Sequence, residues 1–253
     1  MSDAAADDGV PDARPDGREA NGNEAFLLKH AAPGRIGLCT GDEWISKLIR
    51  KAQAPLTADG HRSLWSHAFL FGEQRSDGHW WVIESDLDLR SRQMRLGVQE
   101  NRLSRYRDAE AFPNVAVLDF GLTPEQTQRV MTAALDLLSG LHHYSLSELV
   151  GTMFAMHSRR LRQRDNLLAK EGALYCSAMV QHCYAAAGID LLPGVTGKNV
   201  SPHDIATSPL PHTAHRLIRD LGVSRLRRVA GRTKALLNTP VDELFTTPVD
   251  ELF

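Results

Sequence analysis

Apolar and polar positions between residues 25 and 210 repeat with two different periods. Runs rich in β-branched and aromatic residues, a composition typical of strands, lie at 34–41, 64–72, 79–85 and 115–120. The polar segment 73–77 separates the second run from the third and predicts a β-hairpin. Apolar residues spaced three and four apart predict a helix over 42–52, with Asp42 as its cap, and another that begins at Cys176.

Capping signals mark the starts of two further helices. Thr123 and Gln126 form a capping box at the start of a helix that ends before Gly140. Ser145 and Glu148 form a second box, which predicts another helix. The body of the chain is therefore predicted to contain both strands and helices, with one antiparallel pair in the hairpin.

The two ends of the chain differ in composition from the body. Residues 1–24 combine Asp, Ala, Gly and Pro with few large apolar side chains, which predicts a disordered acidic tail before a domain at 25–210. The segment 211–238 is rich in arginine and is predicted to be a basic helical extension. The last segment, 239–253, is an acidic tail that contains TPVDELF twice.

The duplicated tail motif has two interpretations. It is either a docking element for a protein partner or a frayed amphipathic end, since two copies are too few to stack as a repeat fold. In the first case Leu244, Phe245, Leu252 and Phe253 are the apolar anchors.

Charge and cysteine content restrict the class of protein. The 253 residues carry a net charge of −2, but the two tails hold eleven acidic and two basic residues, so the body has 20 acidic and 27 basic ones. A basic body favours binding to acidic or phosphate-rich surfaces. A membrane surface is one such partner, so peripheral membrane contact is one possibility. The basic segment 216–234 has no aromatic residues, which argues against nucleic-acid binding.

The compartment is predicted from three further absences. Three cysteines match neither a disulfide framework nor a zinc site, which favours a reducing compartment. The N-terminus lacks the basic and apolar regions of a secretory signal, and no apolar run is long enough to cross a bilayer. We expect a protein that is cytoplasmic as synthesised, either staying there or exported without a signal peptide.

Cys176 stands at or next to the N-terminus of a predicted helix. Free backbone N–H groups and the positive end of the helix dipole favour a thiolate there. Cys183 lies two turns further along the same apolar face and is predicted to be a core residue. The position of Cys176 therefore makes it a candidate nucleophile.

A cysteine nucleophile needs a base, and His67 in a β-rich run is the candidate. If Gly72 pairs with His79 in the hairpin, Glu84 lies directly opposite His67 and places a carboxylate beside the imidazole. A one-residue slip would turn Glu84 to the other face of the sheet. The hypothesis therefore depends on the register.

The order of several motifs resembles a known family. PGRIGLCTG, WSHAFLF, VIES, YCSAMVQHCYAAAGIDLLP and VSPHDIA, within 32–208, are similar to the circularly permuted papain-like cysteine hydrolases of the NlpC superfamily, in the YiiX and YebB-like branch. The resemblance implies an α+β fold of permuted papain-like type, with an antiparallel sheet or partial barrel packed against the nucleophile-bearing helix and extra helices. It also implies a nucleophile at Cys176, a base at His67 and an orienting residue at Glu84. Arg35 and Ala178 depart from the family pattern.

The resemblance implies hydrolysis through a thioester formed on the cysteine, without metal or organic cofactor. Cys39, Tyr175 and Ser177 are candidates to line the pocket or to stabilise an oxyanion. The substrate is either an amide of cell-wall peptide type or an ester or thioester of a lipid, and an acyltransferase of the same fold is a further variant. Two other interpretations remain: a toxin-like bacterial effector, and a non-catalytic binding protein that docks through its tail.

Overall fold

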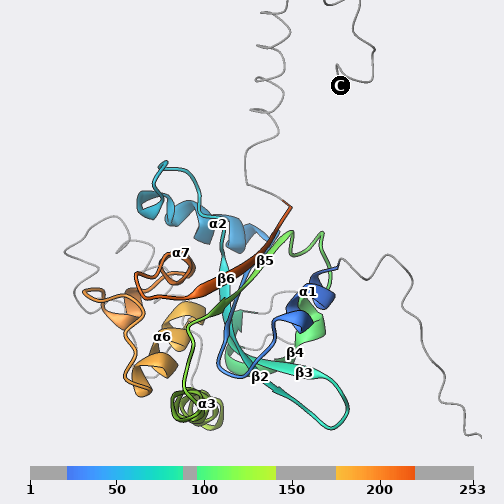
Figure 1. The fold of residues 1–253 in the computed structure, drawn as a ribbon. Helices are drawn as coiled ribbons and strands as arrows, with labels where there is room; N and C mark the ends of the chain where they lie inside the picture. The colour runs from blue at the N-terminus through green and yellow to red at the C-terminus, as the bar shows by residue number, and fades with distance from the viewer. Residues whose placement is uncertain (1–21, 88–95, 141–174, 220–253) are drawn as a thin grey trace, which may run out of the picture. The chain divides into compact units, whose positions relative to one another are not determined.

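A computed structural model of the protein describes residues 22–87, 96–140 and 175–219. In this part the strands form one antiparallel sheet with the order β4-β3-β2-β1-β5-β6 (Figure 1). The strands are β1 (Ile36–Thr40), β2 (His67–Gln74), β3 (Trp80–Leu87), β4 (Leu96–Arg102), β5 (Asn114–Asp119) and β6 (Thr213–Ile218). The predicted α+β class and antiparallel sheet are confirmed.

Helices cover both faces of the sheet. On one side α1 (Asn23–Lys29) and the 3₁₀ turn η2 (Leu103–Tyr106) pack against β5 and β3, while α3 (Pro124–Ser139) and α6 (Cys176–Ala186) pack on the other (Figure 1). Shorter elements complete the described part: α2 (Trp44–Ala52), η1 (Ala54–Leu56), η3 (Gly197–Asn199) and α7 (Pro202–Ala206).

The two faces follow from strict alternation in the central strands. Ile36 and Leu38 of β1 point into the cluster shared with α3 and α6, whereas Cys39 joins the opposite cluster with Phe69 and Phe71 of β2. A strand buried on both faces needs apolar residues at nearly every position, and all five residues of β1 are buried. Burial of both faces fixes the register, since a slip of one residue exchanges the two sets of side chains.

Position 37 in β1 has to be glycine, because an aromatic ring from the neighbouring strand β2 lies against it. Gly37 pairs with Phe69 of β2, and the Phe69 ring lies over the glycine. A Cβ at position 37 would come within 2.1 Å of that ring. The aromatic ring thus fills the space that a side chain would otherwise occupy.

The face of α6 is the one that its sequence predicts. Met179, Val180, Cys183, Tyr184 and Ala187 all belong to the cluster beneath the sheet. Burial raises the pKa of the Cys183 thiol to about 12, so this cysteine is a core residue, as predicted. The end of the helix is also confirmed, since Gly188 follows it with a φ of 77°.

The predicted caps were right for α3 and wrong for α2. Thr123 and Gln126 form both hydrogen bonds of the capping box that opens α3. At α2, however, the N-cap is Glu43 and makes no side-chain cap hydrogen bond, so Asp42 is not the cap.

Two predicted boundaries at the ends of the domain were wrong. Helix α1 begins at Asn23, within the segment predicted to be disordered, because the buried Asn23 amide donates to the carbonyl oxygens of Tyr106 and Phe112. At the other end, Thr213–Ile218 is strand β6, not the start of a helical extension. Ala214 and Ile218 pack against one cluster and Leu217 against the other, which is a strand periodicity.

Strand β4 has no counterpart in the sequence-based prediction. Its residues, LGVQENR, include few apolar ones, since β4 forms one edge of the described sheet. It pairs with β3 over seven residue pairs, from Trp81 with Arg102 to Leu87 with Leu96.

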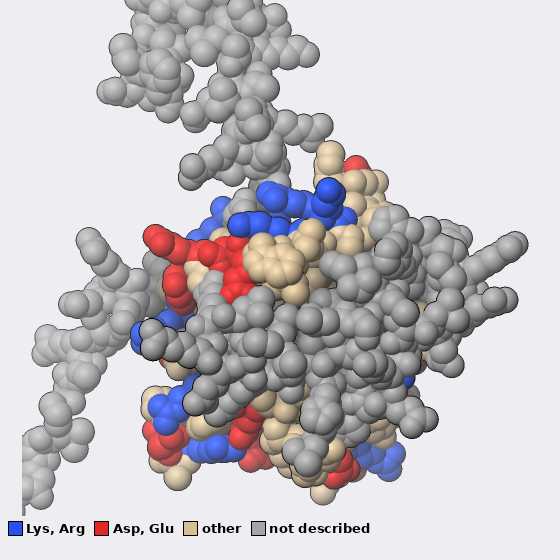
Figure 2. Space-filling view, turned by 180° about the vertical axis from the view of Figure 1, so that it is seen from behind, with Lys and Arg blue, Asp and Glu red and all other residues tan. Residues whose placement is uncertain are grey.

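Several predictions concern residues outside the described ranges. These are the disordered tail over 1–21, the helix after Ser145, the basic extension beyond 219 and the two TPVDELF motifs. Among the described helices, none is long and apolar enough to span a membrane. Seen from behind, the described surface carries separate patches of basic and acidic side chains (Figure 2).

Candidate active site

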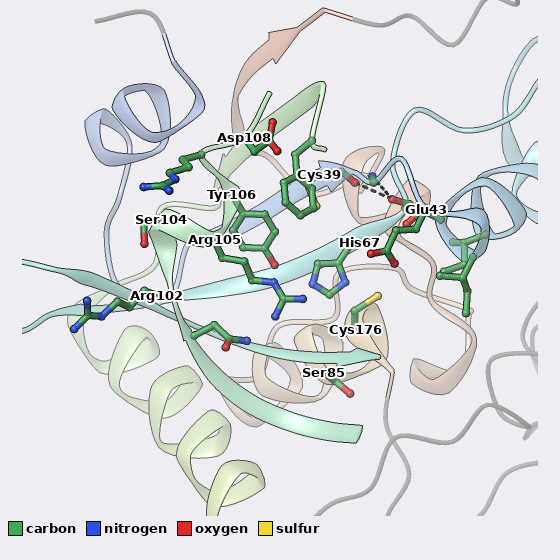
Figure 3. A pocket seen from close by; sticks show the side chains of 18 residues that line it. Cys39, Glu43, His67, Ser85, Arg102, Ser104, Arg105, Tyr106, Asp108 and Cys176 are labelled. Atoms are coloured by element: carbon green, nitrogen blue, oxygen red, sulfur yellow. Dashed lines mark hydrogen bonds between the residues drawn. The ribbon is translucent and has the colours of Figure 1, made fainter. Parts of the chain in front are cut away.

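The cavity beside the start of α6 has a volume of about 710 Å³. It lies where β1 ends and β2 begins, and η2 and α2 supply its walls. Cys176, His67 and Cys39 all line it, and the Cys176 side chain lies beside the His67 ring (Figure 3). The structure therefore brings together a cysteine and a histidine that are 109 positions apart in the chain.

His67 and Glu84 are in contact, by a register different from the predicted one. Leu70 pairs with Ile83 and Phe71 with Val82, so the ladder is shifted by two residues from the predicted one. Extended by one residue, this register sets Glu84 opposite Phe69 instead of His67. A shift of two preserves the face on which a side chain lies. His67 Nε2 consequently meets Glu84 Oε2 on the diagonal, at 2.6 Å.

Glu84 is completely buried and accepts hydrogen bonds on both carboxylate oxygens. Besides His67, Tyr106 donates its hydroxyl to Oε2, Asn101 donates its amide to Oε1 at 2.7 Å, and Arg105 Nη1 lies 3.6 Å from Oε1. These donors supply the partners that a buried carboxylate requires. The carboxylate is thereby fixed in position against the imidazole.

The same neighbours keep Glu84 ionised. Burial by itself would raise the pKa of Glu84, but the hydrogen bond and charge of His67, the charge of Arg105 and the hydrogen bond from Tyr106 outweigh it. The pKa of Glu84 is lowered from its ordinary 4.5 to about 2. A carboxylate that stays charged orients the imidazole and stabilises its protonated form.

Cys176 is the first residue of α6, and its side chain is 6% exposed. The first N–H groups of a helix have no partner inside the helix, and here the backbone bonds of α6 begin with Met179 N–H to Tyr175 O at 2.9 Å. The helix start thus provides N–H groups and a positive dipole end next to the sulfur.

Tyr175 and Ser177 have structural contacts at this helix start. The Ser177 hydroxyl donates to Val200 O at 2.7 Å, and the Tyr175 hydroxyl donates to Val200 O at 3.1 Å and to Lys198 O. Neither residue lines the cavity. Their hydroxyls instead attach α6 to the segment 197–200. A role for these two residues in stabilising an oxyanion stays a prediction.

Cys39 does line the cavity, although it is only 1% exposed. It pairs with His67 across β1 and β2 and belongs to the cluster of Phe69 and Phe71. Cys39 therefore forms part of the apolar floor under the imidazole.

Three residues that hold Glu84 have no signal in the sequence. Asn101 comes from the unpredicted strand β4, and Arg105 and Tyr106 come from the 3₁₀ turn that follows it. Tyr106 also stacks on Phe69, with 4.4 Å between the ring centroids. No motif marks these residues, because their role arises only from the pairing of β4 with β3.

The described histidines outside the cavity do not gather with other metal ligands. His212 stacks on Phe120, and His215 stacks on His30 with 3.8 Å between the ring centroids. Within the described ranges, no group of three or more His, Cys, Asp or Glu side chains is arranged to hold a metal ion.

Comparisons with known proteins give one structural match to report. No family model and no curated protein matches the sequence. Among solved structures the chain resembles the crystal structure of the metalloprotein YiiX from Escherichia coli O157:H7, with a TM-score of 0.49 and 16% sequence identity. The match covers 76% of this chain and 98% of the other.

Proposed function

We propose that the protein is a cysteine hydrolase of permuted papain-like type, with Cys176 as nucleophile, His67 as base and Glu84 as the residue that orients His67. The observation that carries this proposal is the shared cavity: a cysteine at a helix start, and a histidine whose Nε2 is bound to a buried carboxylate. Nucleophile, base and orienting group in this arrangement are typical of covalent catalysis.

The first half-reaction forms a thioester. Because Glu84 engages Nε2, proton exchange with the sulfur falls to Nδ1 of His67, which accepts the thiol proton as the sulfur attacks the carbonyl carbon. The oxyanion that results is stabilised by N–H groups at the start of α6. The bond to the leaving group then breaks, and His67 returns its proton to that group.

The second half-reaction consumes water. His67 accepts a proton from a water molecule, whose oxygen attacks the thioester carbonyl. The carbon–sulfur bond breaks, the sulfur leaves as thiolate and His67 gives the proton back to it. The products are a carboxylic acid and the leaving group as an alcohol, amine or thiol.

Alkylation rates test the assignment of the nucleophile. Iodoacetamide should label Cys176 at least about tenfold faster than Cys183, because burial raises the pKa of Cys183 and only the thiolate reacts. The matched variants Cys39→Ala and Cys183→Ala should leave the fast labelling phase intact, and Cys176→Ala should remove it. Equal, slow labelling of all three cysteines would contradict the proposal.

Activity on acyl compounds tests the reaction. A soluble aryl ester or thioester should be turned over by the wild type and by Cys183→Ala, and Cys176→Ala should lose that turnover while retaining the wild-type circular dichroism spectrum. A folded Cys176→Ala protein with full turnover would refute the mechanism.

A further inference from the structure

Helix α2 buries a cation and exposes large apolar side chains. Arg50 is 3% exposed, whereas Trp44 is 63% and Leu48 is 46% exposed. The structure describes all of α2, and none of its residues belongs to the two large clusters that form the core. This is the reverse of the usual pattern for an amphipathic surface helix.

The polar side of α2 explains why the helix is inverted. Arg50 Nε donates to Ser63 O at 2.8 Å. Just after the helix, Gln53 Nε2 donates to Trp65 O at 2.8 Å and Gln53 Oε1 accepts the His203 N–H at 2.8 Å. These bonds turn the polar side inward and the apolar side away from the core.

The apolar side is continuous with the cavity. At 100° per residue, five residues occupy one arc of about 140°; in order around the helix they are Trp44, Leu48, Ala52, Ile45 and Ile49. Ile45 and Ile49, at one end of the arc, line the cavity that contains Cys176. The arc, which we call the α2 stripe, thus leads from the open surface to the candidate active site.

Cations flank the exposed end of the stripe. Lys47 and Lys51 are exposed; Lys47 lies three positions after Trp44 and Lys51 three positions after Leu48, on the same side of the helix. Tryptophan with neighbouring lysines is the pattern of helices that lie in the interface of an anionic membrane.

We propose that the α2 stripe docks on an anionic phospholipid membrane and that the cavity takes an acyl ester of a phospholipid from it. The second clause rests on the proposed function, while the docking does not. A volume of about 710 Å³ is within the range of ligand-binding cavities. The stripe gives an acyl chain an apolar path past Ile45 and Ile49 toward Cys176.

Vesicle sedimentation tests the docking. Phosphatidylcholine vesicles that contain phosphatidylglycerol should bind the full chain. The double variant Trp44→Ser, Leu48→Ser should bind them at least about tenfold more weakly, because it lacks the two apolar side chains that would enter the membrane interface. The matched control is Leu28→Ser, Leu135→Ser, which removes two other exposed leucines, 43% and 52% exposed, and should bind as the wild type does. Equal losses in both double variants would overturn the proposal.

The lysines give a second measurement. Lys47→Gln with Lys51→Gln should lower affinity for the anionic vesicles roughly tenfold or more at low salt and leave binding to pure phosphatidylcholine unchanged. Wild-type binding that is independent of phosphatidylglycerol, or no binding to either vesicle, would refute docking on an anionic surface.

Two substrates separate this proposal from the hydrolase itself. The Trp44, Leu48 variant should turn over the soluble aryl ester at the wild-type rate and lose hydrolysis of vesicle phospholipid. Soluble-ester turnover without vesicle binding would refute the docking and leave the hydrolase standing. If the protein binds vesicles but shows no turnover that is lost in Cys176→Ala, the hydrolase proposal is refuted and the docking proposal is supported.

Discussion

His67 and Glu84 meet on a diagonal between two strands, with 2.6 Å between Nε2 and Oε2, although neither residue is opposite the other in the ladder. The residue opposite Glu84 in that register is Phe69, whose ring stacks on Tyr106. Tyr106 in turn donates its hydroxyl to the Glu84 carboxylate. The aromatic pair therefore supports the carboxylate that supports the imidazole.

Replacing the buried carboxylate by an amide should impair catalysis. In Glu84→Gln, only one of the two positions keeps an acceptor oxygen, so the NH₂ faces the donor from Asn101 on one side or the donors from Tyr106 and His67 on the other. We expect kcat on the soluble ester to fall about 100-fold or more, because the imidazole loses its orienting charge. Steady-state kinetics measures this.

The control is Glu100→Gln, which neutralises a carboxylate on β4 that pairs with Arg75 away from Glu84. It should keep wild-type kcat. If kcat fell by a similar factor in both variants, the rate would depend on the total negative charge of β3 and β4 and not on the contact between Glu84 and His67.

Stability at low pH should depend on Glu84. The pKa of Glu84 is lower in the folded protein than its ordinary value of 4.5, so its contribution to stability is complete above pH 4.5 and is lost as the pH falls toward about 2. The free energy of unfolding of the wild type should therefore fall more steeply between pH 5 and 2.5 than that of Glu84→Gln, as urea titrations at each pH would measure. Parallel curves for the two proteins would contradict the lowered pKa.

The start of α6 should depend on two hydroxyls that share one acceptor. Tyr175 and Ser177 both donate to the buried Val200 carbonyl oxygen. Either Tyr175→Phe or Ser177→Ala leaves that oxygen one donor, whereas the double variant leaves it none. The double variant should be destabilised by about 1–2 kcal/mol beyond the sum of the single changes.

Urea unfolding of the four proteins measures this coupling. The double variant should also lose the fast alkylation of Cys176, because the helix start is no longer held against the segment 197–200. Strictly additive losses would mean that the two hydroxyls act independently.

Local patterns in the sequence located most elements correctly. The capping box at Thr123, the face of α6 and the central strands were predictable because each depends on neighbours a few residues away. The edge strands β4 and β6 were not, because their polar composition resembles that of loops and only pairing with β3 and β5 makes them strands. The donors to Glu84 were missed for the same reason.

The α2 stripe shows the limit of periodicity. Its apolar spacing correctly predicted an amphipathic helix, which begins at Trp44 and not at residue 42, but periodicity does not specify which side packs inward. The hydrogen bonds of Arg50 and Gln53 to partners later in the chain decided that, and they leave Trp44 and Leu48 exposed.

The sequence by itself determined a cysteine at a helix start, a histidine in a strand and a carboxylate on the same face of the next strand, since helical and strand periods are local properties of the chain. Only the tertiary structure decided that the sulfur and the imidazole line one cavity, that the carboxylate lies on the diagonal and that Asn101, Arg105 and Tyr106 surround it. These contacts join residues far apart in sequence, and they exist because both faces of one sheet must be covered at the same time.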